Sequence, residues 1–333
     1  MMMQFGLIGI GAGAAAALLF ASVTSGSWLS ILLFYLAPLP IMIAGLGWSH
    51  WAALTAALSG ALGLGLVFGP VFFFAFLAGA GIPAWWLGYL AMLARPGIIA
   101  GGNRQNGATS AAALEWYPPG RLVVWAAVLA AMIVVVAIPN FGIDAESFRI
   151  ALHDALARML RLEIGAPADA PISVPGVSNA DRLIDFLVAA IPPAAAVLAT
   201  ITNVLNLWLS ARIVKFSGLL KRPWPQLSAM TFPRAVAAAL AAAMALSFLN
   251  GLVGIVAGVL SASLLMAYGV LGFAVLHAIT QGMTSRGFVL GGVYAAVTVL
   301  GWPVLALCLL GLIETAFNIR GRIAHKRGPP APS

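Results

Sequence analysis

The sequence predicts an all-α fold, that of a polytopic α-helical integral membrane protein with about eight transmembrane helices plus one broken or re-entrant segment. Of its 333 residues, 62% are hydrophobic and 8% are charged, whereas about 25% are charged in soluble domains. Residues 1–94 contain no Asp, Glu, Lys or Arg. A water-soluble globule is therefore excluded. The 36 Gly and 20 Pro follow no period, which also excludes collagen-like and disordered chains.

Uncharged stretches locate the first spans, because a bilayer core takes about 20 apolar residues per helix. Turn signals divide the first stretch into four expected helices, 5–22, 28–47, 50–68 and 70–94. The chain start resembles a signal peptide at Phe20-Ala21-Ser22. It lacks a basic beginning, however, and further apolar segments follow at once, so we expect it to remain as a membrane helix.

The later uncharged stretches are more irregular. Single spans are expected over 122–143 and 186–211. In the second of these, Pro192-Pro193 predicts a kink or a restarted turn. The stretch 235–285 is long enough for two helices, divided near Asn250-Gly251 or Gly254.

Orientation follows the Lys and Arg residues of short loops, which mark the cytoplasmic side. Three segments are basic and are expected to be cytoplasmic: the loops 95–121 and 212–234 and the tail 316–333. Residues 139–185 carry seven acidic residues against four arginines, a net charge of −3. The segment 144–185 should therefore lie outside.

One hydrophobic segment is expected not to cross the membrane. Nine crossings from a cytoplasmic N-terminus would leave the basic tail outside, against the rule that sets orientation. The best candidate is 287–313, interrupted at Trp302-Pro303, although 235–285 folding differently from two spans would also resolve the conflict. Non-helical backbone at that depth needs shielding by protein or a wet cavity.

The formal net charge of +8 collects on one predicted membrane face. Nucleic-acid binding would also favour such a surplus, but the chain has no aromatic-basic module or soluble domain to present it. We therefore expect membrane lipids, and no nucleic acid, as partners of the basic surface.

Residues Asp144 to Ile164 predict an amphipathic helix outside the membrane, with apolar side chains at helical spacing. These are Phe148, Leu152, Leu156, Met159, Leu160 and Ile164. A connector with Pro167, Pro171 and Pro175 follows, and Ser178-Asn179-Ala180-Asp181 resembles a capping box. The helix either bridges two spans on the membrane surface or forms a lid over a ligand pocket.

Two polar stripes lie on otherwise apolar helices, where polar groups usually face the bundle interior. They comprise Thr200, Asn203, Asn206 and Ser210, and His277, Thr280, Gln281 and Thr284. Such residues serve either as interhelical hydrogen bonds or as pocket lining. Further isolated candidates are Asn250, Tyr294, Tyr35 and Tyr89. The predicted ligand-binding residues are Asn203, Asn206, Asn250, His277 and Gln281.

Catalysis and metal binding have no positive support in the sequence. Cys308 is the single cysteine, and the four histidines His50, His153, His277 and His325 lie far apart. Glu314 is interpreted as an interfacial residue that meets water or a nearby arginine. No local motif supplies a nucleophile with its base. We expect no enzyme activity, no metal and no cofactor.

Small residues recur on one face of the first helix, as in close helix–helix contacts. Gly9, Ala12, Gly13 and Ala16 are the predicted docking residues on this face. Gly254 with Gly258 and Gly287 with Gly291 repeat the spacing.

Two C-terminal stretches resemble a YybS-like family of bacterial membrane proteins of unknown function. Leu271–His277 is similar to a QGLAVxH-like segment and Leu310–Arg320 to an LGLxDxxFDFR-like exit. The chain has Leu271 in place of Gln, and Glu314 and Asn318 in place of Asp. This resemblance implies a multi-pass protein of the bacterial inner membrane. The distribution of Lys and Arg, with an even number of crossings, predicts that both termini are cytoplasmic.

The N-terminal part resembles the substrate-binding subunits of energy-coupling-factor transporters, through Pro38–Leu46 and the Gly/Ala-rich helix after it. In that family a small-residue face of the first helix docks on a coupling subunit, which implies this role for the face at Gly9 and Gly13. The chain has no GxxxxGK[ST] loop. An ATP-driven role would therefore need a separate ATPase among other membrane subunits.

These observations together favour a small-molecule-binding or transporter-like membrane subunit that holds its ligand between helices, under the segment 144–164. A membrane scaffold or assembly protein without transport activity is the alternative. A lipid flippase or lipid-modifying enzyme also stays open, since membrane enzymes can assemble sites from distant helices.

Overall fold

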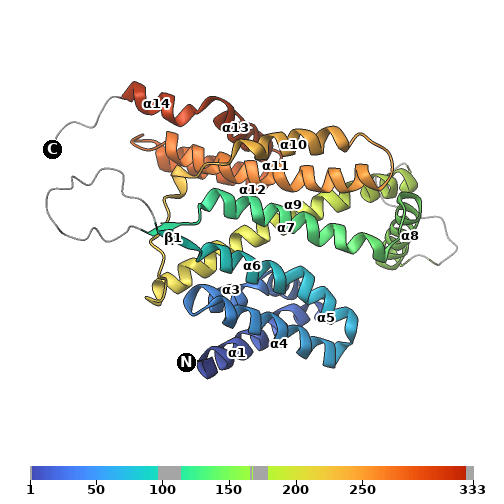
Figure 1. The fold of residues 1–333 in the computed structure, drawn as a ribbon. Helices are drawn as coiled ribbons and strands as arrows, with labels where there is room; N and C mark the ends of the chain where they lie inside the picture. Colours follow the sequence, from blue (N-terminus) through green and yellow to red (C-terminus); the bar gives the residue numbers. More distant parts are fainter. Residues whose placement is uncertain (1, 97–113, 166, 168–178, 328–333) are drawn as a thin grey trace. The chain divides into compact units, whose positions relative to one another are not determined.

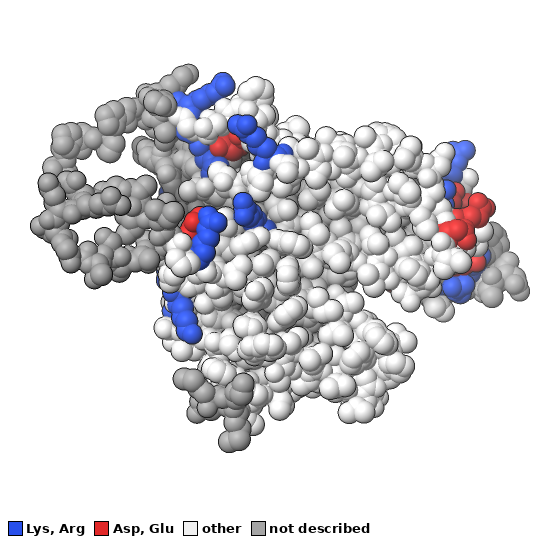
Figure 2. Space-filling view, viewed as in Figure 1, with Lys and Arg blue, Asp and Glu red and all other residues white. Residues whose placement is uncertain are grey.

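The computed structural model describes residues 2–96, 114–165, 167 and 179–327 of the chain. Helices dominate these residues, and the only strands described there are a short pair, as Figure 1 shows. Figure 2 shows a broad uncharged surface over the helix bodies, as expected for helices in lipid. The all-α membrane class is confirmed.

Seven helical stretches in the described part of the chain are long and apolar enough to cross a bilayer. They are Phe5–Ser25, Trp28–Gly47, His50–Phe68, Pro70–Ala91, Pro119–Asn140, Ala180–Phe216 and Leu252–Ile279. Three further apolar helices are shorter, Arg234–Leu246, Arg286–Leu300 and Val304–Phe317. The chain forms two compact units, residues 1–126 with 202–230 and residues 127–201 with 231–333. The sequence did not indicate this division.

The first unit holds the four expected N-terminal spans. Its elements are α1 (Met2–Ala21), η1 (Ser22–Ser25), α2 (Trp28–Tyr35), α3 (Pro38–Gly47), α4 (His50–Phe68), α5 (Pro70–Phe76), η2 (Leu77–Gly81), α6 (Ile82–Ala91), β1 (Ala94–Pro96), β2 (Leu114–Trp116) and η4 (Leu227–Ala229). Side-chain caps begin two helices, since Ser27 accepts from the Ser30 N–H and Ser49 from the Ala52 N–H. Prolines open α3 and α5, where a missing N–H costs nothing.

A two-stranded antiparallel hairpin lies in the expected cytoplasmic loop 95–121. Strand β1 pairs with β2, with Arg95 opposite Glu115. The Arg95 Nε donates to Glu115 Oε2 at 2.8 Å. This bond and the arginine charge lower the pKa of the Glu115 carboxyl from its ordinary value. The expected cytoplasmic arginine Arg104 lies outside the described residues.

Helices α7 (Pro119–Ala137) and α9 (Ala180–Phe216) contribute residues to both units. The remaining elements belong to the second unit: η3 (Ile138–Asn140), α8 (Ala145–Ile164), α10 (Arg234–Leu246), α11 (Leu252–Ile279), α12 (Arg286–Leu300), α13 (Val304–Phe317) and α14 (Ile319–Arg327).

The amphipathic helix predicted over 144–164 is confirmed as α8. Asp144 caps its start by accepting from the N–H groups of Glu146 and Ser147, and Gly165 ends it with φ +64°. Phe148 and Leu152 are buried in an apolar cluster with Ile138, Ile184 and Val188. Met159 and Ile164, in contrast, are exposed. Only the first half of the predicted apolar face is therefore covered.

Helix α9 is longer than the span expected over 186–211, with 37 residues. It starts at Ala180, where the Asn179 side chain accepts from the Arg182 N–H at 3.0 Å. The cap is thus Asn179 rather than the Ser178 of the expected capping box; Ser178 and most of the proline-rich connector lie outside the described residues. The helix runs through Pro192-Pro193 without interruption.

The C-terminal stretches divide where the sequence indicated, into shorter helices than expected. The stretch 235–285 breaks at Ser247 to Gly251, where Gly251 has φ +84°. Helix α10 has only 13 residues, about 20 Å, against about 30 Å of hydrocarbon. The segment 287–313 breaks at Gly301 to Pro303 into α12 and α13. Neither half is long enough for a full span.

Candidate functional site

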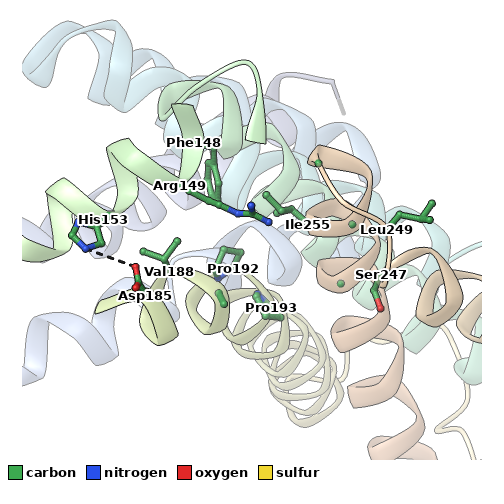
Figure 3. A pocket seen from close by; sticks show the side chains of 14 residues that line it. Phe148, Arg149, His153, Asp185, Val188, Pro192, Pro193, Ser247, Leu249 and Ile255 are labelled. Atoms are coloured by element: carbon green, nitrogen blue, oxygen red, sulfur yellow. Dashed lines mark ion pairs between the residues drawn. The ribbon is translucent and has the colours of Figure 1, made fainter. Parts of the chain in front are cut away.

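A cavity of about 490 Å³ lies in the second unit between α8, α9 and the start of α11. Figure 3 shows its lining side chains. Three come from α8 (Phe148, Arg149, His153), five from α9 (Asp185, Val188, Ala189, Pro192, Pro193) and six from residues 247–258 (Ser247, Leu249, Gly251, Gly254, Ile255, Gly258). The cavity therefore lies beneath the segment that the sequence identified as a surface helix or lid.

Two prolines in the α9 wall, Pro192 and Pro193, remove helical N–H donors. A proline has no N–H to donate to the carbonyl four residues earlier. Pro192 therefore gives Val188 no helical donor at that position. Ala189 loses both its i+3 donor, at Pro192, and its i+4 donor, at Pro193. Val188 and Ala189 both line the cavity, and the two prolines leave the carbonyls of these residues with fewer helical donors than elsewhere in α9.

Glycines on the α11 side create the space. A Cβ at Gly258 would meet no atom within 4 Å. Gly254, by contrast, lies so close to the Leu249 carbonyl that a side chain there would collide with backbone. Gly251 adopts φ +84°, which only glycine tolerates readily. The turn before α11 thus holds its shape through Gly251 and Gly254, while Gly258 leaves the cavity open.

Three ionisable side chains line the α8 side of the cavity. His153 Nε2 lies 3.8 Å from Asp185 Oδ1, and His153 Nδ1 lies 3.9 Å from Asp154 Oδ1. Both separations are too long for hydrogen bonds. Arg149 extends from α8 toward Ile255 in Figure 3. It forms no ion pair with any carboxylate of the described residues.

The hydroxyl in the cavity lining is not paired with the histidine there. Ser247 is the hydroxyl that lines the cavity, and its Oγ donates to the Met244 carbonyl at 2.7 Å. It does not donate to His153, so no nucleophile and base are paired. Among the described residues no group of three His, Cys, Asp or Glu side chains could hold a metal ion. The lining combines apolar side chains with the polar side chains of Arg149, His153, Asp185 and Ser247.

Asn203 and Asn206, predicted as ligand-binding residues, instead bond to backbone in the first unit. Both are buried. Asn203 Nδ2 donates to the Ala126 carbonyl at 3.2 Å, and Asn206 Nδ2 donates to the Tyr35 carbonyl at 2.8 Å. Neither lines the cavity. Of the two roles that the sequence left open for this stripe, these bonds support the interhelical one.

The Asn206 bond has a cause in the sequence of the predicted span 28–47. Pro38 interrupts this span, so α2 ends at Tyr35 and α3 begins at Pro38. The Leu39 N–H bonds to the Leu36 carbonyl instead of Tyr35. The Tyr35 carbonyl is left without a helical donor, and the Asn206 amide supplies one. The Asn206 Oδ1 is buried without a hydrogen-bond partner.

The other predicted ligand residues, His277, Gln281 and Asn250, do not line the cavity either. His277 Nε2 lies 3.0 Å from the Tyr294 hydroxyl, which joins α11 to α12. Tyr294 also stacks on Phe273, with ring centroids 5.1 Å apart. Gln281 is exposed in the turn after α11. Asn250 is exposed in the turn whose neighbours Leu249 and Gly251 line the cavity.

The predicted docking face of α1 is occupied within the chain. Gly9 and Gly13 are buried against α4, where a Cβ would collide with Ala52 and Ala56 carbonyls. Ala16 is fully buried and Ala12 half-buried. Docking on a partner stays a prediction. In this structure the small residues allow close packing of α1 on α4.

The other small-residue pairs that the sequence indicated, Gly254 with Gly258 and Gly287 with Gly291, do not bring two helices together. A Cβ at Gly258, Gly287 or Gly291 would meet nothing within 4 Å. The closest helix contact in the second unit instead joins α11 and α13, through Gly269, Gly272 and Gly311. A Cβ on Gly272 would collide with the Leu307 carbonyl, and one on Gly311 with the Tyr268 carbonyl. Spacing alone did not distinguish these glycines from the others.

Sequence reasoning missed Arg149, His153 and Asp185 as cavity residues. Arg149 and His153 lie four residues apart on the charged face of α8. Asp185 lies just before the expected span 186–211. The one signal in the sequence for a site near these residues was Pro192-Pro193, because carbonyls that lose their helical donors in a membrane helix need another partner.

Comparisons with protein-family models, curated proteins and solved structures found no match to this chain.

Proposed function

We propose that this chain is a small-molecule-binding, transporter-like membrane protein whose ligand occupies the cavity between α8, α9 and α11. The observation that carries this proposal is the cavity itself. Its volume of about 490 Å³ lies within the roughly 300–1,000 Å³ typical of small-molecule sites. Ten of its 14 lining residues are apolar or glycine, and four carry polar side chains, a combination found in such sites.

The lining defines the ligand's chemistry. The apolar side chains of Phe148, Val188 and Ile255 favour an apolar body. Arg149 favours a carboxylate or phosphate, since guanidinium binds both in a bidentate manner. The Val188 and Ala189 carbonyls and Asp185 accept from N–H or O–H groups. A small amphipathic molecule with an acidic group and hydrogen-bond donors at its polar end satisfies all of these.

Helix α8 is proposed as the lid of this site. It supplies one wall, yet only Phe148, Leu152 and Ala157 are buried along its length. A helix held by so few apolar contacts belongs to the low-stability part of a protein, from which lids are drawn. Opening of α8 would admit a ligand from the side that carries the acidic segment.

Filling the cavity tests the proposal. A Cβ at Gly258 would meet no atom within 4 Å, so a Gly258→Leu variant starts its side chain from open space in the cavity lining. Gly291→Leu is the matched control, since Gly291 also faces open space but on α12 and outside the cavity. We expect amphipathic acids to raise the melting temperature of purified wild-type protein and of Gly291→Leu, and to leave Gly258→Leu unchanged.

Native mass spectrometry of the purified protein provides the second measurement. A co-purified small molecule should be present on wild type and absent from Gly258→Leu. A screen of vitamins, cofactors and lipids that finds no binder on wild type would argue against the proposal. Equal binding by both glycine variants would place the ligand elsewhere.

The resemblance to energy-coupling-factor transporters makes a separate prediction, which concerns the energy source. Because Gly9 and Gly13 pack on α4, a coupling subunit would contact the exposed α1 residues Leu7, Ile10 and Leu18. Co-purification with a partner ATPase, lost on substitution of these three by Ser, is the expected outcome.

A further inference from the structure

Two cations at the end of α9, in the first unit, lie on a group of aromatic rings. The Arg212 guanidinium carbon lies 5.9 Å from the Trp208 ring centroid, 5.3 Å from that of Phe216 and 5.5 Å from that of Trp224. The Lys215 ammonium lies 4.9 Å from the Trp224 centroid. Trp224 therefore contacts both cations.

The sequence explains this arrangement. Trp208 and Phe216 are four residues before and after Arg212, so all three share one face of α9. Trp224 reaches the same cations from the segment that follows the helix. Each contact lies within the range of a cation–π interaction. A guanidinium held over rings keeps its N–H groups free to donate at their edge, in the fork that matches a phosphate.

These cations have no anionic partner in the described residues. No ion pair joins Arg212 or Lys215 to a carboxylate there. The segment 212–234 has five basic residues and no acidic one. Arg222 differs, because it is already bound: its guanidinium donates to the Ala91 and Tyr117 carbonyls at 2.9 and 2.8 Å. Arg212 and Lys215 are thus the fixed cations that lack an acceptor.

The position of the cluster selects the kind of anion. Helix α9 has the length and composition of a membrane span and ends at Phe216. Trp residues and cations at the end of a span lie at the level of lipid headgroups. Phe216 and Trp208 are exposed, at 83% and 46%, and give acyl chains an apolar surface beside the charges. We infer that Arg212, Lys215 and Trp224 bind the phosphate of an anionic phospholipid.

Lipid retention measured by native mass spectrometry tests this site. The protein is released from nanodiscs that contain phosphatidylglycerol and phosphatidylcholine, and the bound lipid is counted. The variant R212Q/K215Q removes both cations. The control K221Q/R234Q removes the same charge from the same segment, at exposed residues outside the cluster. A third variant, W224L, keeps every charge and removes the shared ring.

We expect wild type to retain phosphatidylglycerol in preference to phosphatidylcholine. R212Q/K215Q should lose about fivefold in phosphatidylglycerol retention for each cation removed. W224L should also lose retention, and K221Q/R234Q should keep most of it. Equal losses in the two double variants would show a general charge effect and overturn the site, as would unchanged retention in R212Q/K215Q. Unchanged melting temperatures in phosphatidylcholine confirm that each variant is folded.

Competition with inorganic phosphate distinguishes a lipid headgroup from a free phosphate ion as the anion bound by this cluster. Addition of millimolar phosphate should leave the bound phosphatidylglycerol in place, because the rings hold its acyl region as well. Displacement of the lipid by free phosphate would overturn the assignment to a lipid.

Discussion

Several single polar side chains in this protein satisfy backbone groups that a proline or a helix start leaves open. Asn206 is the clearest case, since it donates to the carbonyl at the break before Pro38. Replacement by Leu leaves the Tyr35 carbonyl buried without a donor. We expect Asn206→Leu to lower the free energy of unfolding by about 1–2 kcal/mol.

Thermal unfolding in detergent measures this loss. Asn250→Leu is the matched control, because Asn250 is exposed in a turn and should leave the melting temperature unchanged. Equal melting temperatures for Asn206→Leu and wild type would contradict the role of this amide.

Arg222 holds two segments of the first unit together through carbonyls near the end of α6 and the end of β2. Burial lowers the pKa of its guanidinium from the ordinary value, and it stays charged at neutral pH. Lysine has a single ammonium and cannot reproduce the fork that reaches both oxygens. We expect Arg222→Lys to cost about 1–3 kcal/mol, measured by urea unfolding, with exposed Arg234→Lys as the control.

At the scale of one element, α8 depends on its N-cap. Hydrogen bonds from the Ser147 and Glu146 N–H groups and the Ser147 hydroxyl lower the pKa of the Asp144 carboxyl. A carboxyl with a lowered pKa stabilises the folded state above its unfolded value, about 3.9. That stabilisation is lost as the pH falls through the folded value.

The start of α8 should therefore loosen as the pH falls below about 4. Hydrogen exchange of the Ser147 and Phe148 amides at several pH values measures this. The variant Asp144→Asn keeps a capping oxygen but does not titrate. After correction for the intrinsic pH dependence of amide exchange, its exchange rates should change little with pH. A wild-type profile identical to that of Asp144→Asn would exclude the cap as the cause.

Helices α11 and α13 are held at the distance that Gly272 and Gly311 permit. Gly311→Val would force its Cβ into the Tyr268 carbonyl, and the helices would have to separate. Separation loses packing contacts, and overpacked sites typically cost about 1–3 kcal/mol. We expect a lower melting temperature for Gly311→Val, and no change for Gly291→Val on the open face of α12. Equal stability of the two variants would exclude a tight crossing.

How much of these elements the sequence predicted depends on the kind of signal. The lengths of the apolar stretches predicted the long spans, because each stretch is solvated by lipid independently of the others. Asp144 and Gly165 mark the limits of α8, because helix caps act through neighbouring residues. Contacts between distant segments left no such signal: Asn206 and Tyr35 are far apart in sequence, and Gly311 looks no different from Gly291. The cavity escaped prediction for the same reason, since α8, α9 and α11 build it together.

At the scale of the whole molecule, the orientation of the ends is the main prediction. The basic loops predict that Ser285, after α11, and the C-terminal tail lie in the cytoplasm, while Ser25, after α1, lies outside. Single cysteines at these positions, introduced with Cys308→Ala, test this with an impermeant thiol reagent on intact cells. We expect labelling of Ser25→Cys alone. Labelling of Ser285→Cys would reverse the assignment of the C-terminal helices.

The length of α9 has one more consequence. Its 37 residues extend about 55 Å, well beyond the roughly 30 Å of hydrocarbon. A substantial part of the helix must stand clear of the acyl chains or be accommodated by tilt. The first turns of the helix carry Asp181, Arg182 and Asp185, and charged side chains favour water or headgroups over acyl chains.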